Sequence, residues 1–213
     1  MIKIRNGLIA AATGLILSIS VSSIAKAATF DFLAYGNALE RGYASYVKTE
    51  GGITVTATGK DGASNAFAYL DSGNAGLGVC KVLDGGNQCD PSNDDNVTDL
   101  EILNLSFDQD ITIDSITFKD ANHQTVLLAG GSLDFSVDGG GSSPMSLSVG
   151  DWGDFDGSIG SLFSFANDGT QFYISSITVS AVPLPPSLIL FGVALAGLGF
   201  LGHRRRKAQT NMT

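Results

Sequence analysis

The densest group of side chains that could do chemistry is an acidic segment near the middle of the chain. Residues 90–101 read Asp-Pro-Ser-Asn-Asp-Asp-Asn-Val-Thr-Asp-Leu-Glu, so five carboxylates and two asparagine amides fall within twelve residues. Calcium takes about six to eight oxygen ligands, and a loop that leads into a strand can supply several of them. We therefore predict a calcium site with Asp94, Asp95 and Glu101 as ligands. A solvated loop of aspartate and asparagine turns explains the same residues equally well.

The only two cysteines of the chain, Cys80 and Cys89, lie just before this segment. Eight residues separate them, and an Asp-Gly-Gly sequence at 84–86 favours a turn between them. In an oxidising compartment such a pair is expected to form a disulfide. A metal site is disfavoured, because two thiols without a nearby histidine make an incomplete zinc ligand set.

A second acidic group at residues 151–157 reads Asp-Trp-Gly-Asp-Phe-Asp-Gly and holds the only tryptophan, Trp152. Its Asp-x-Asp-Gly portion is half of a calcium-loop pattern, which is a weak signal by itself. Trp152 and Phe155 could stack on sugar rings if they were exposed. A lone tryptophan in a β protein more often packs in the core, and we favour that interpretation.

No group of residues indicates catalysis. His123 is the only histidine between residues 28 and 181, and the chain has no Gly-x-Ser-x-Gly nucleophile elbow. A glycosidase needs two carboxyl groups in different environments, and no pair stands out among the many aspartates. We therefore predict no catalytic residue and place His123 at the surface or in a turn.

The charge of the central region excludes one class of partner. All 21 acidic residues of the chain lie within residues 28–181, against only five basic ones, which gives this region a formal charge of -16. Nucleic acids are bound through lysine and arginine, so we expect no nucleic-acid partner. A strongly acidic surface keeps a protein soluble and permits binding of divalent cations.

The elements that must position these residues are predicted to be strands. Apolar and polar residues alternate over 53–56, 103–107, 133–138 and 145–149, with Gly- and Asp-rich turns at 71–74, 84–87 and 138–141. No part of 28–181 shows a sustained helical period. Together with the 27 glycines, this pattern predicts an all-β domain, an antiparallel β-sandwich with a jelly-roll-like arrangement.

Two of the predicted strands change their inward face partway along. In the first strand the apolar residues are at odd positions over 111–113 and at even positions over 116–118. In the second strand they are at even positions over 172–174 and at odd positions over 177–179. An extra residue that switches the inward face is typical of a β-bulge, which we predict at Asp114–Ser115 and at Ser175–Ser176. A sharp bend between two sheets is the alternative.

The N-terminus has the pattern of a secretory signal peptide. Lys3 and Arg5 precede an apolar stretch over residues 7–21, and Ala-Lys-Ala at 25–27 offers small residues at the expected cleavage site. We predict a signal peptide over residues 1–27, removed by signal peptidase after Ala27. A retained membrane helix is the weaker interpretation, because the apolar stretch is short.

The C-terminus carries three segments in a fixed order. A proline-rich segment at 182–186 is followed by sixteen apolar or small residues at 187–202 and then by a basic cluster. The prolines end regular structure, the apolar run partitions into a bilayer, and the cations stay on the cytoplasmic side. The residues of the proline motif and of the basic cluster are Val182, Pro183, Leu184, Pro185, Arg204, Arg205, Arg206 and Lys207.

This tail, residues 182–207, resembles the PEP-CTERM sorting signal in its Val-Pro-Leu-Pro-Ala-like variant. The resemblance implies export across the inner membrane of a Gram-negative bacterium, processing near the prolines by a membrane-embedded exosortase, and a host that makes exopolysaccharide. Pro186 departs from the commonest form, which has alanine there. An ordinary transmembrane anchor is the alternative interpretation, which the small-residue content of the run disfavours. Residues 208–213 form a short tail after the signal.

The predicted organisation is thus a signal peptide, a β-sandwich ectodomain over residues 28–181, and a sorting signal. We expect a non-enzymatic protein of the cell surface or extracellular matrix, with signal peptidase, exosortase and, transiently, the inner membrane as partners, associated with exopolysaccharide or biofilm. The alternative is a carbohydrate-binding module or carbohydrate-active enzyme delivered by the same route.

Overall fold

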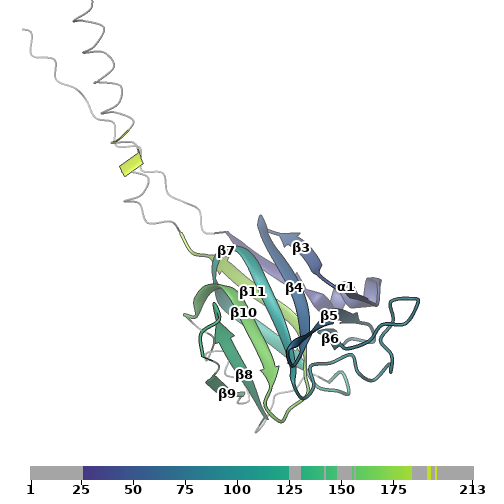
Figure 1. The fold of residues 1–213 in the computed structure, drawn as a ribbon. Coiled ribbons are helices and arrows are strands. Elements are labelled where there is room, and N and C mark those ends of the chain that lie inside the picture. The colour runs from purple at the N-terminus through teal and green to yellow at the C-terminus, as the bar shows by residue number, and fades with distance from the viewer. Residues whose placement is uncertain are drawn as a thin grey trace, which may run out of the picture.

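The computed structural model describes residues 26–124, 131–141, 143–147, 155, 157–183, 191, 192 and 195. These residues form a β-rich domain with one short helix, which confirms the all-β prediction (Figure 1). In chain order the elements are β1 (Ala27–Asp31), α1 (Phe32–Ala38), β2 (Arg41–Tyr43), β3 (Tyr46–Glu50), β4 (Ile53–Asp61), β5 (Ser64–Asp71), β6 (Gly76–Cys80), β7 (Glu101–Lys119), β8 (Gly131–Val137), β9 (Ser143–Leu147), β10 (Ile159–Asn167) and β11 (Tyr173–Ala181).

The strands form one connected antiparallel sheet. Its main path runs β1-β11-β6-β5-β4-β7-β10-β8-β9, while β2 pairs with β5 and β3 with β4. A further pairing joins β11 to β7, so that β7, β4, β5, β6 and β11 make a closed circuit. The long strand β7 makes this closure feasible, because its first half pairs with β4 and its second half with β11.

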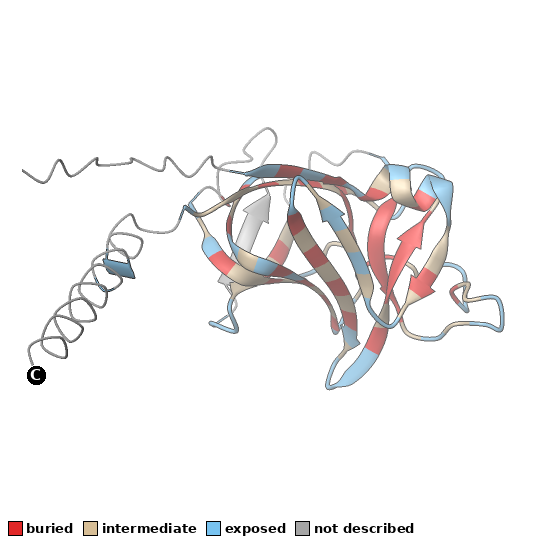
Figure 2. Ribbon diagram, turned by 90° about the horizontal axis from the view of Figure 1, so that it is seen from above, coloured by how far each residue is buried: buried red, intermediate tan, exposed pale blue. Residues whose placement is uncertain are grey.

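The core lies inside this circuit and continues between β7, β8 and β10. Burial alternates along the strands, which Figure 2 shows as buried bands at every second position. Phenylalanines fill much of the interior: Phe135 meets Phe155 edge to face at 5.0 Å between ring centroids, and Phe118 meets Phe172 at 5.5 Å. Phe155 is therefore a core residue and is not exposed to stack on a sugar, whereas Trp152, for which a core position was predicted, lies outside the described residues.

Both predicted bulges are present in the β7–β11 pair, one in each strand and at different points along the pairing. The register skips Asp114, because Ser115 pairs with Thr178 and Ile113 with Val179. It also skips Ser175, whose hydroxyl donates to the Thr117 carbonyl at 3.1 Å. Each bulge moves the apolar side chains that follow it back to the interior, so both halves of β7 bury a continuous face.

The two ends of the described domain lie side by side. β1 pairs with β11, with Ala27 opposite Ser180, and the Ala181 amide donates to the Lys26 carbonyl at 2.7 Å. One residue later, the Val182 amide donates to the Asp110 carbonyl at 3.0 Å. β11 therefore runs into the proline motif without a linker (Figure 1).

Most of the predicted signal peptide and most of the predicted sorting signal lie outside the described residues. Of the predicted signal peptide only Lys26 and Ala27 are described, and of the proline motif only Val182 and Pro183. Leu184, Pro185 and the whole basic cluster at 204–207 lie outside. Within the described part of the chain, no helix is long and apolar enough to cross a membrane.

Candidate functional site

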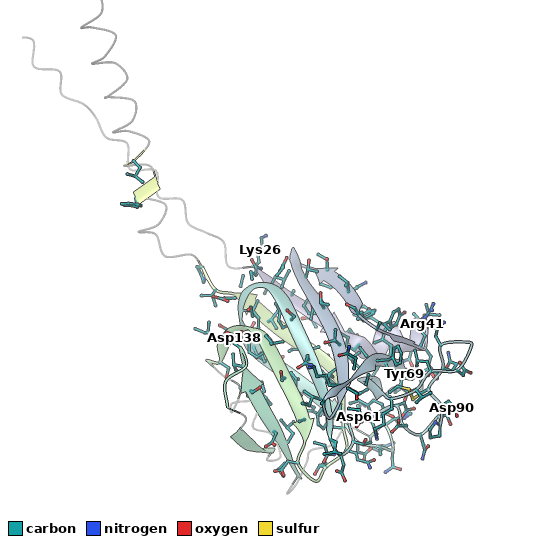
Figure 3. All side chains as sticks on the ribbon, in the orientation of Figure 1. Lys26, Arg41, Asp61, Tyr69, Asp90 and Asp138 are labelled. Atoms are coloured by element: carbon teal, nitrogen blue, oxygen red, sulfur yellow. A yellow bond between two sulfur atoms is a disulfide. The ribbon has the colours of Figure 1, made fainter. Side chains whose placement is uncertain are left out.

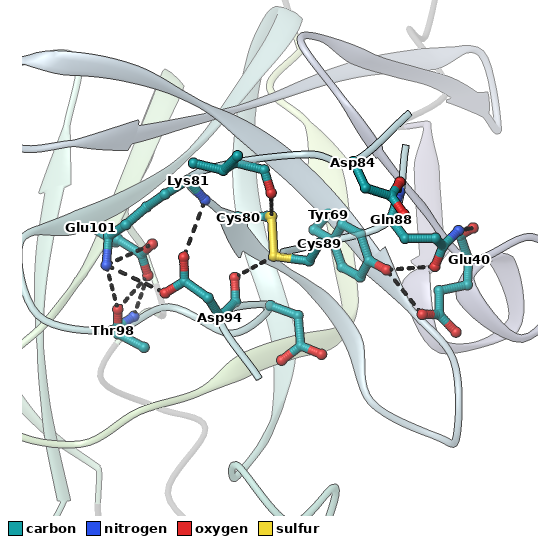
Figure 4. Close-up of a disulfide and its surroundings, with 12 residues drawn as sticks. Glu40, Tyr69, Cys80, Lys81, Asp84, Gln88, Cys89, Asp94, Thr98 and Glu101 are labelled. Carbon is teal, nitrogen blue, oxygen red and sulfur yellow. Dashed lines mark hydrogen bonds and ion pairs between the residues drawn. A yellow bond between two sulfur atoms is a disulfide. The ribbon is translucent and has the colours of Figure 1, made fainter. Parts of the chain in front are cut away.

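Cys80, the last residue of β6, forms a disulfide with Cys89, which confirms the predicted pair (Figure 4). The two Cα atoms are 5.8 Å apart. The closed loop is shaped by Asp84, whose Oδ1 atom accepts hydrogen bonds from the amides of Gly86 and Gln88 at 2.7 and 2.8 Å. The turn predicted from the Asp-Gly-Gly sequence is thus an aspartate-stabilised turn held shut by the disulfide.

The predicted calcium ligands do not form one set. Asp94 and Glu101 share the ammonium group of Lys81, at 3.3 and 3.6 Å from Nζ (Figure 4). Glu101 is fully buried at the start of β7, its Oε2 atom accepts from the amide and the hydroxyl of Thr98 at 2.6 and 2.7 Å, and burial raises its pKa. A lysine thus takes the position of the predicted cation between these two carboxylates.

Asp95 faces another part of the molecule, although it is adjacent to Asp94 in the chain. Its Oδ1 atom accepts a hydrogen bond from the Tyr173 hydroxyl at 2.5 Å. No group of three or more histidine, cysteine, aspartate or glutamate side chains in the described residues is arranged to hold a metal ion. Asp94 contacts Lys81 and Asp95 contacts Tyr173, so the three predicted ligands do not converge, and calcium binding by them stays a prediction.

Asp95 instead belongs to a polar cleft of about 460 Å³ at one end of the sheet. The cleft lies where β5 and β7 end and where β6 and β11 begin. It is lined by Glu40, Asp71, Ser92, Asn93, Asp95, Asn96, Ala121, His123, Gln171 and Tyr173. Three carboxyl groups from separate chain segments thus meet one imidazole and one phenol.

Asp71 and His123 form the innermost pair. Asp71 ends β5 and is buried, and its Oδ2 atom lies 3.1 Å from His123 Nε2. The other ring nitrogen, Nδ1, lies 3.1 Å from the Gly73 carbonyl. Burial, then the nearby Asp95, raises the pKa of Asp71 to about 6, against the opposing effect of His123. Because the Gly73 carbonyl can only accept, Nδ1 donates to it, and the Asp71–His123 contact holds one shared proton.

Tyr173, the first residue of β11, links this pair to Asp95. Its ring meets the His123 ring edge to face at 5.4 Å, while its hydroxyl donates to Asp95. Burial raises the pKa of Asp95, partly offset by that hydrogen bond. Burial and the Asp95 carboxylate together raise the pKa of Tyr173, so the phenol stays a donor.

Glu40 completes the acidic side of the cleft. It follows α1, and its carboxylate accepts a hydrogen bond from the Tyr69 hydroxyl at 2.9 Å (Figure 4) and another from the Ser72 hydroxyl. The Gln88 amide donates to the Glu40 backbone carbonyl at 2.9 Å. The disulfide loop, which contains Gln88, is thereby attached to the rim of the cleft.

Two glycines allow the segments of the cleft to approach closely. A Cβ atom on Gly78 of β6 would lie 2.1 Å from the Asp95 carbonyl oxygen, so only glycine lets the Asp95–Asn96 segment cross this strand. A Cβ atom on Gly36 of α1 would lie 2.1 Å from the Asp71 carbonyl oxygen. The bridge between Val97 and Phe172 then fixes the same loop against the start of β11.

Sequence reasoning found Asp95 but grouped it with two acidic residues that lie outside the cleft. It placed His123 in a turn, which is correct, since His123 has a φ of 60°, but it missed the contact with Asp71. Glu40, Asp71 and Tyr173 were not singled out. Asp71 ends β5, Tyr173 begins β11 and Glu40 lies between α1 and β2, and only the strand order brings these three residues together.

No protein-family model, no curated protein and no solved structure matches this chain.

Proposed function

We propose that this is an exported, non-enzymatic protein of the cell surface or extracellular matrix, delivered by signal peptidase and an exosortase. In this proposal the ectodomain is a jelly-roll-like sandwich, and the mature protein associates with exopolysaccharide or biofilm. The supporting observation is the junction at residues 181–183. The last strand ends there, and the proline motif, apolar run and basic cluster follow in the order of an exosortase substrate.

The position of the two ends supports the same route. Because β1 and β11 are paired neighbours, the signal peptide and the sorting tail leave the domain at one end. This arrangement lets a precursor be held in one membrane by both termini. The disulfide adds support, since such bonds persist in oxidising compartments.

The test is mass spectrometry of the protein recovered from a host with an intact exosortase and from the same host lacking it. With the exosortase, we expect an N-terminus near Ala28 and a C-terminus between residues 182 and 187. Without it, the peptide containing Arg204–Lys207 should remain attached and stay in the membrane fraction. Full-length C-termini in the surface fraction of the intact host would contradict the proposal.

A charge variant tests the role of the basic cluster. Replacing the four cations at 204–207 with glutamine should reduce correct orientation and processing, because cytoplasmic positive charge sets topology. The matched control exchanges each arginine for lysine and Lys207 for arginine, which keeps the charge. Processing should be normal in that control.

Carbohydrate binding by the same exported protein is the second candidate. The observation that favours it is the cleft, whose carboxyl and amide groups are the kind that hydrogen-bond sugar hydroxyls. Incubating the protein with the exopolysaccharide of its own host, and measuring both sedimentation with the polymer and release of short chains, separates binding from hydrolysis.

A further inference from the structure

The cleft is rich in hydrogen-bond acceptors and poor in positive charge. Three carboxyl groups line it, and among its described lining residues His123 is the only side chain that can carry a positive charge. The donors that satisfy the carboxylates are neutral hydroxyls, namely Tyr173 on Asp95 and Tyr69 and Ser72 on Glu40. These hydroxyls orient the carboxylates but do not neutralise them.

Asn96 provides an independent indication of a missing ligand. The residue is 2 % exposed, and its Nδ2 atom donates to Gln171 Oε1 at 3.2 Å. Its Oδ1 atom is buried and has no hydrogen-bond partner. A buried carbonyl oxygen without a donor costs free energy, so a cleft wall that holds one is suited to a donor from outside. The Asp71 Oδ2 atom already has His123 Nε2 as a partner at 3.1 Å, but a carboxylate oxygen can accept a second donor.

The donor that fits is an ammonium group rather than a bare metal ion. A metal would need several ligands converging at about 2.0–2.6 Å, and the described part of the chain has no such group of acidic or histidine side chains. An ammonium group offers three N–H donors and one positive charge, and its hydrogen bonds to carboxylates span about 2.7–2.9 Å. It therefore matches both the available acceptors and the excess negative charge.

We propose that this cleft binds a small molecule through a protonated primary amine, held by Asp71, Asp95 and the Asn96 carbonyl. The volume of about 460 Å³ lies within the range of small-molecule sites, about 300–1,000 Å³, so it takes a compact ligand. The edge-to-face pair of His123 and Tyr173 forms one firm wall. This inference concerns the ectodomain alone, and it stands or falls independently of the sorting route.

Matched pairs of probes test the charge requirement without any mutation. The full-length protein in detergent solution is titrated by calorimetry with glucosamine and glucose, and with putrescine and 1,4-butanediol. Within each pair the two compounds differ only by amine and hydroxyl groups. We expect at least one amine to bind about tenfold or more tightly than its neutral partner, because a charge-assisted hydrogen bond contributes about 1.5–3 kcal/mol, and 1.4 kcal/mol is tenfold in Kd.

Substitutions of two of the proposed ligands locate the site. Asp95→Asn and Asn96→Ala should each weaken amine binding about tenfold. Asp99→Asn, which removes one charge from an exposed position in the same loop, should leave it unchanged. Thermal melts of each variant check that the fold is intact. If a variant does not fold, the amine and neutral probe pairs titrated into the wild-type protein still test the proposal.

Several outcomes would overturn the proposal. If neither amine binds more tightly than its neutral partner, the proposal is wrong. If, in that case, glucose and glucosamine both bind, the cleft is a neutral sugar site instead. If calcium chloride competes with the amine at equimolar concentration, the cleft takes any cation and the ammonium assignment fails. If Asp99→Asn weakens binding as much as Asp95→Asn, the effect is long-range charge and the cleft is not the site.

Discussion

At the scale of single residues, Asp71 is the group with the clearest consequence for pH. It is buried and faces the acidic residues Asp95 and Glu40, and their effect on its pKa outweighs the opposing effects of His123 and of the Ser72 amide. The titratable groups that face it are Glu40, Tyr69, Asp95, His123 and Tyr173. Its carboxyl group therefore takes up a proton far more readily in the folded protein than in the unfolded chain.

The pH dependence of stability follows from the pKa of Asp71, raised from 3.8 to about 6. The folded state binds the proton more tightly, so the stabilising contribution is complete below about pH 4 and is lost as pH rises through about 6. From pH 4 to 7 the wild type should lose about 2–3 kcal/mol relative to Asp71→Asn. Urea denaturation at each pH measures this difference, with Asp99→Asn as the control. A difference that is constant with pH would contradict it.

Amine binding should depend on the same proton. Protonation of Asp71 removes one of the proposed ligands, so affinity should fall as pH decreases from 7 to 5 while the amine itself stays charged. Calorimetric titration of glucosamine at both values tests this, and Asp71→Asn should bind weakly at both. Unchanged wild-type affinity at pH 5 would place the amine away from Asp71.

The hydroxyl of Tyr173 has a separate, testable role. Tyr173→Phe keeps the ring against His123 but removes the donor to Asp95, which leaves a part-buried carboxylate without that partner. We expect a loss of about 1–3 kcal/mol in the free energy of unfolding at pH 7, measured by urea denaturation. The loss should shrink at pH 4, where Asp95 gains a proton. Tyr43→Phe, on a different strand, is the control.

At the scale of elements, alternation along the chain was enough to predict β4, β7, β8 and β11 and both bulges. It was not enough for β5 and β6, whose residues are buried on both faces near the cleft, so their sequence does not alternate. The cleft escaped sequence analysis for another reason. Asp71, Asp95 and His123 are brought together by antiparallel pairing of distant strands, and no local pattern encodes that pairing.

Gly78 of β6 allows the Asp95–Asn96 segment to pack directly against this strand. Gly78→Ala would force a methyl group into the Asp95 carbonyl, so we expect at least about 1–3 kcal/mol of destabilisation and loss of amine binding. Gly85→Ala, where a Cβ atom meets nothing within 4 Å, is the matched control and should change neither. Thermal melts and calorimetry give both readouts. A Gly78→Ala protein with normal stability would show that the loop can move away from β6.

The disulfide should stabilise the folded state, and the domain should still fold when it is removed. Closing a loop of about ten residues is worth roughly 2.5–3 kcal/mol in the chain-entropy model. Replacing both cysteines with serine should therefore lower the free energy of unfolding by about that amount. The rim of the cleft should loosen as well, because Gln88 connects the loop to Glu40. Urea denaturation with and without reductant checks the estimate, since reductant should affect the wild type alone.

At the scale of the whole molecule, β11 joins the cleft at one end to the start of the proline motif at the other. Its first residue, Tyr173, lines the cleft, and its last, Ala181, precedes the proline motif. The eight steps between its nine residues, at about 3.3 Å each, place the two ends roughly 26 Å apart. Figure 3 shows Lys26 where the described chain leaves the domain, with Tyr69 and Asp90 on the far side. The cleft therefore points away from the proposed membrane attachment.

This orientation can be measured on the full-length protein in lipid bilayers. A fluorescent non-natural amino acid is placed at Asp110, beside Val182, or at Asn122, beside His123. Both positions are exposed, and neither touches the disulfide. A quencher attached to the lipid headgroups should quench the label at 110 more strongly than the label at 122. Equal quenching would mean that the domain lies flat on the bilayer.

The course of β11 also has a mechanical consequence. The strand is hydrogen-bonded to β1, β6 and β7, so tension applied at its C-terminal end pulls parallel to those strands. Such a load is shared among many hydrogen bonds in shear, whereas a strand peeled from an edge breaks them one at a time. A ligand held at Tyr173 and an envelope attached beyond Ala181 would pull on opposite ends of this one strand. Its architecture suits a tether that must bear force between a cell and the material around it.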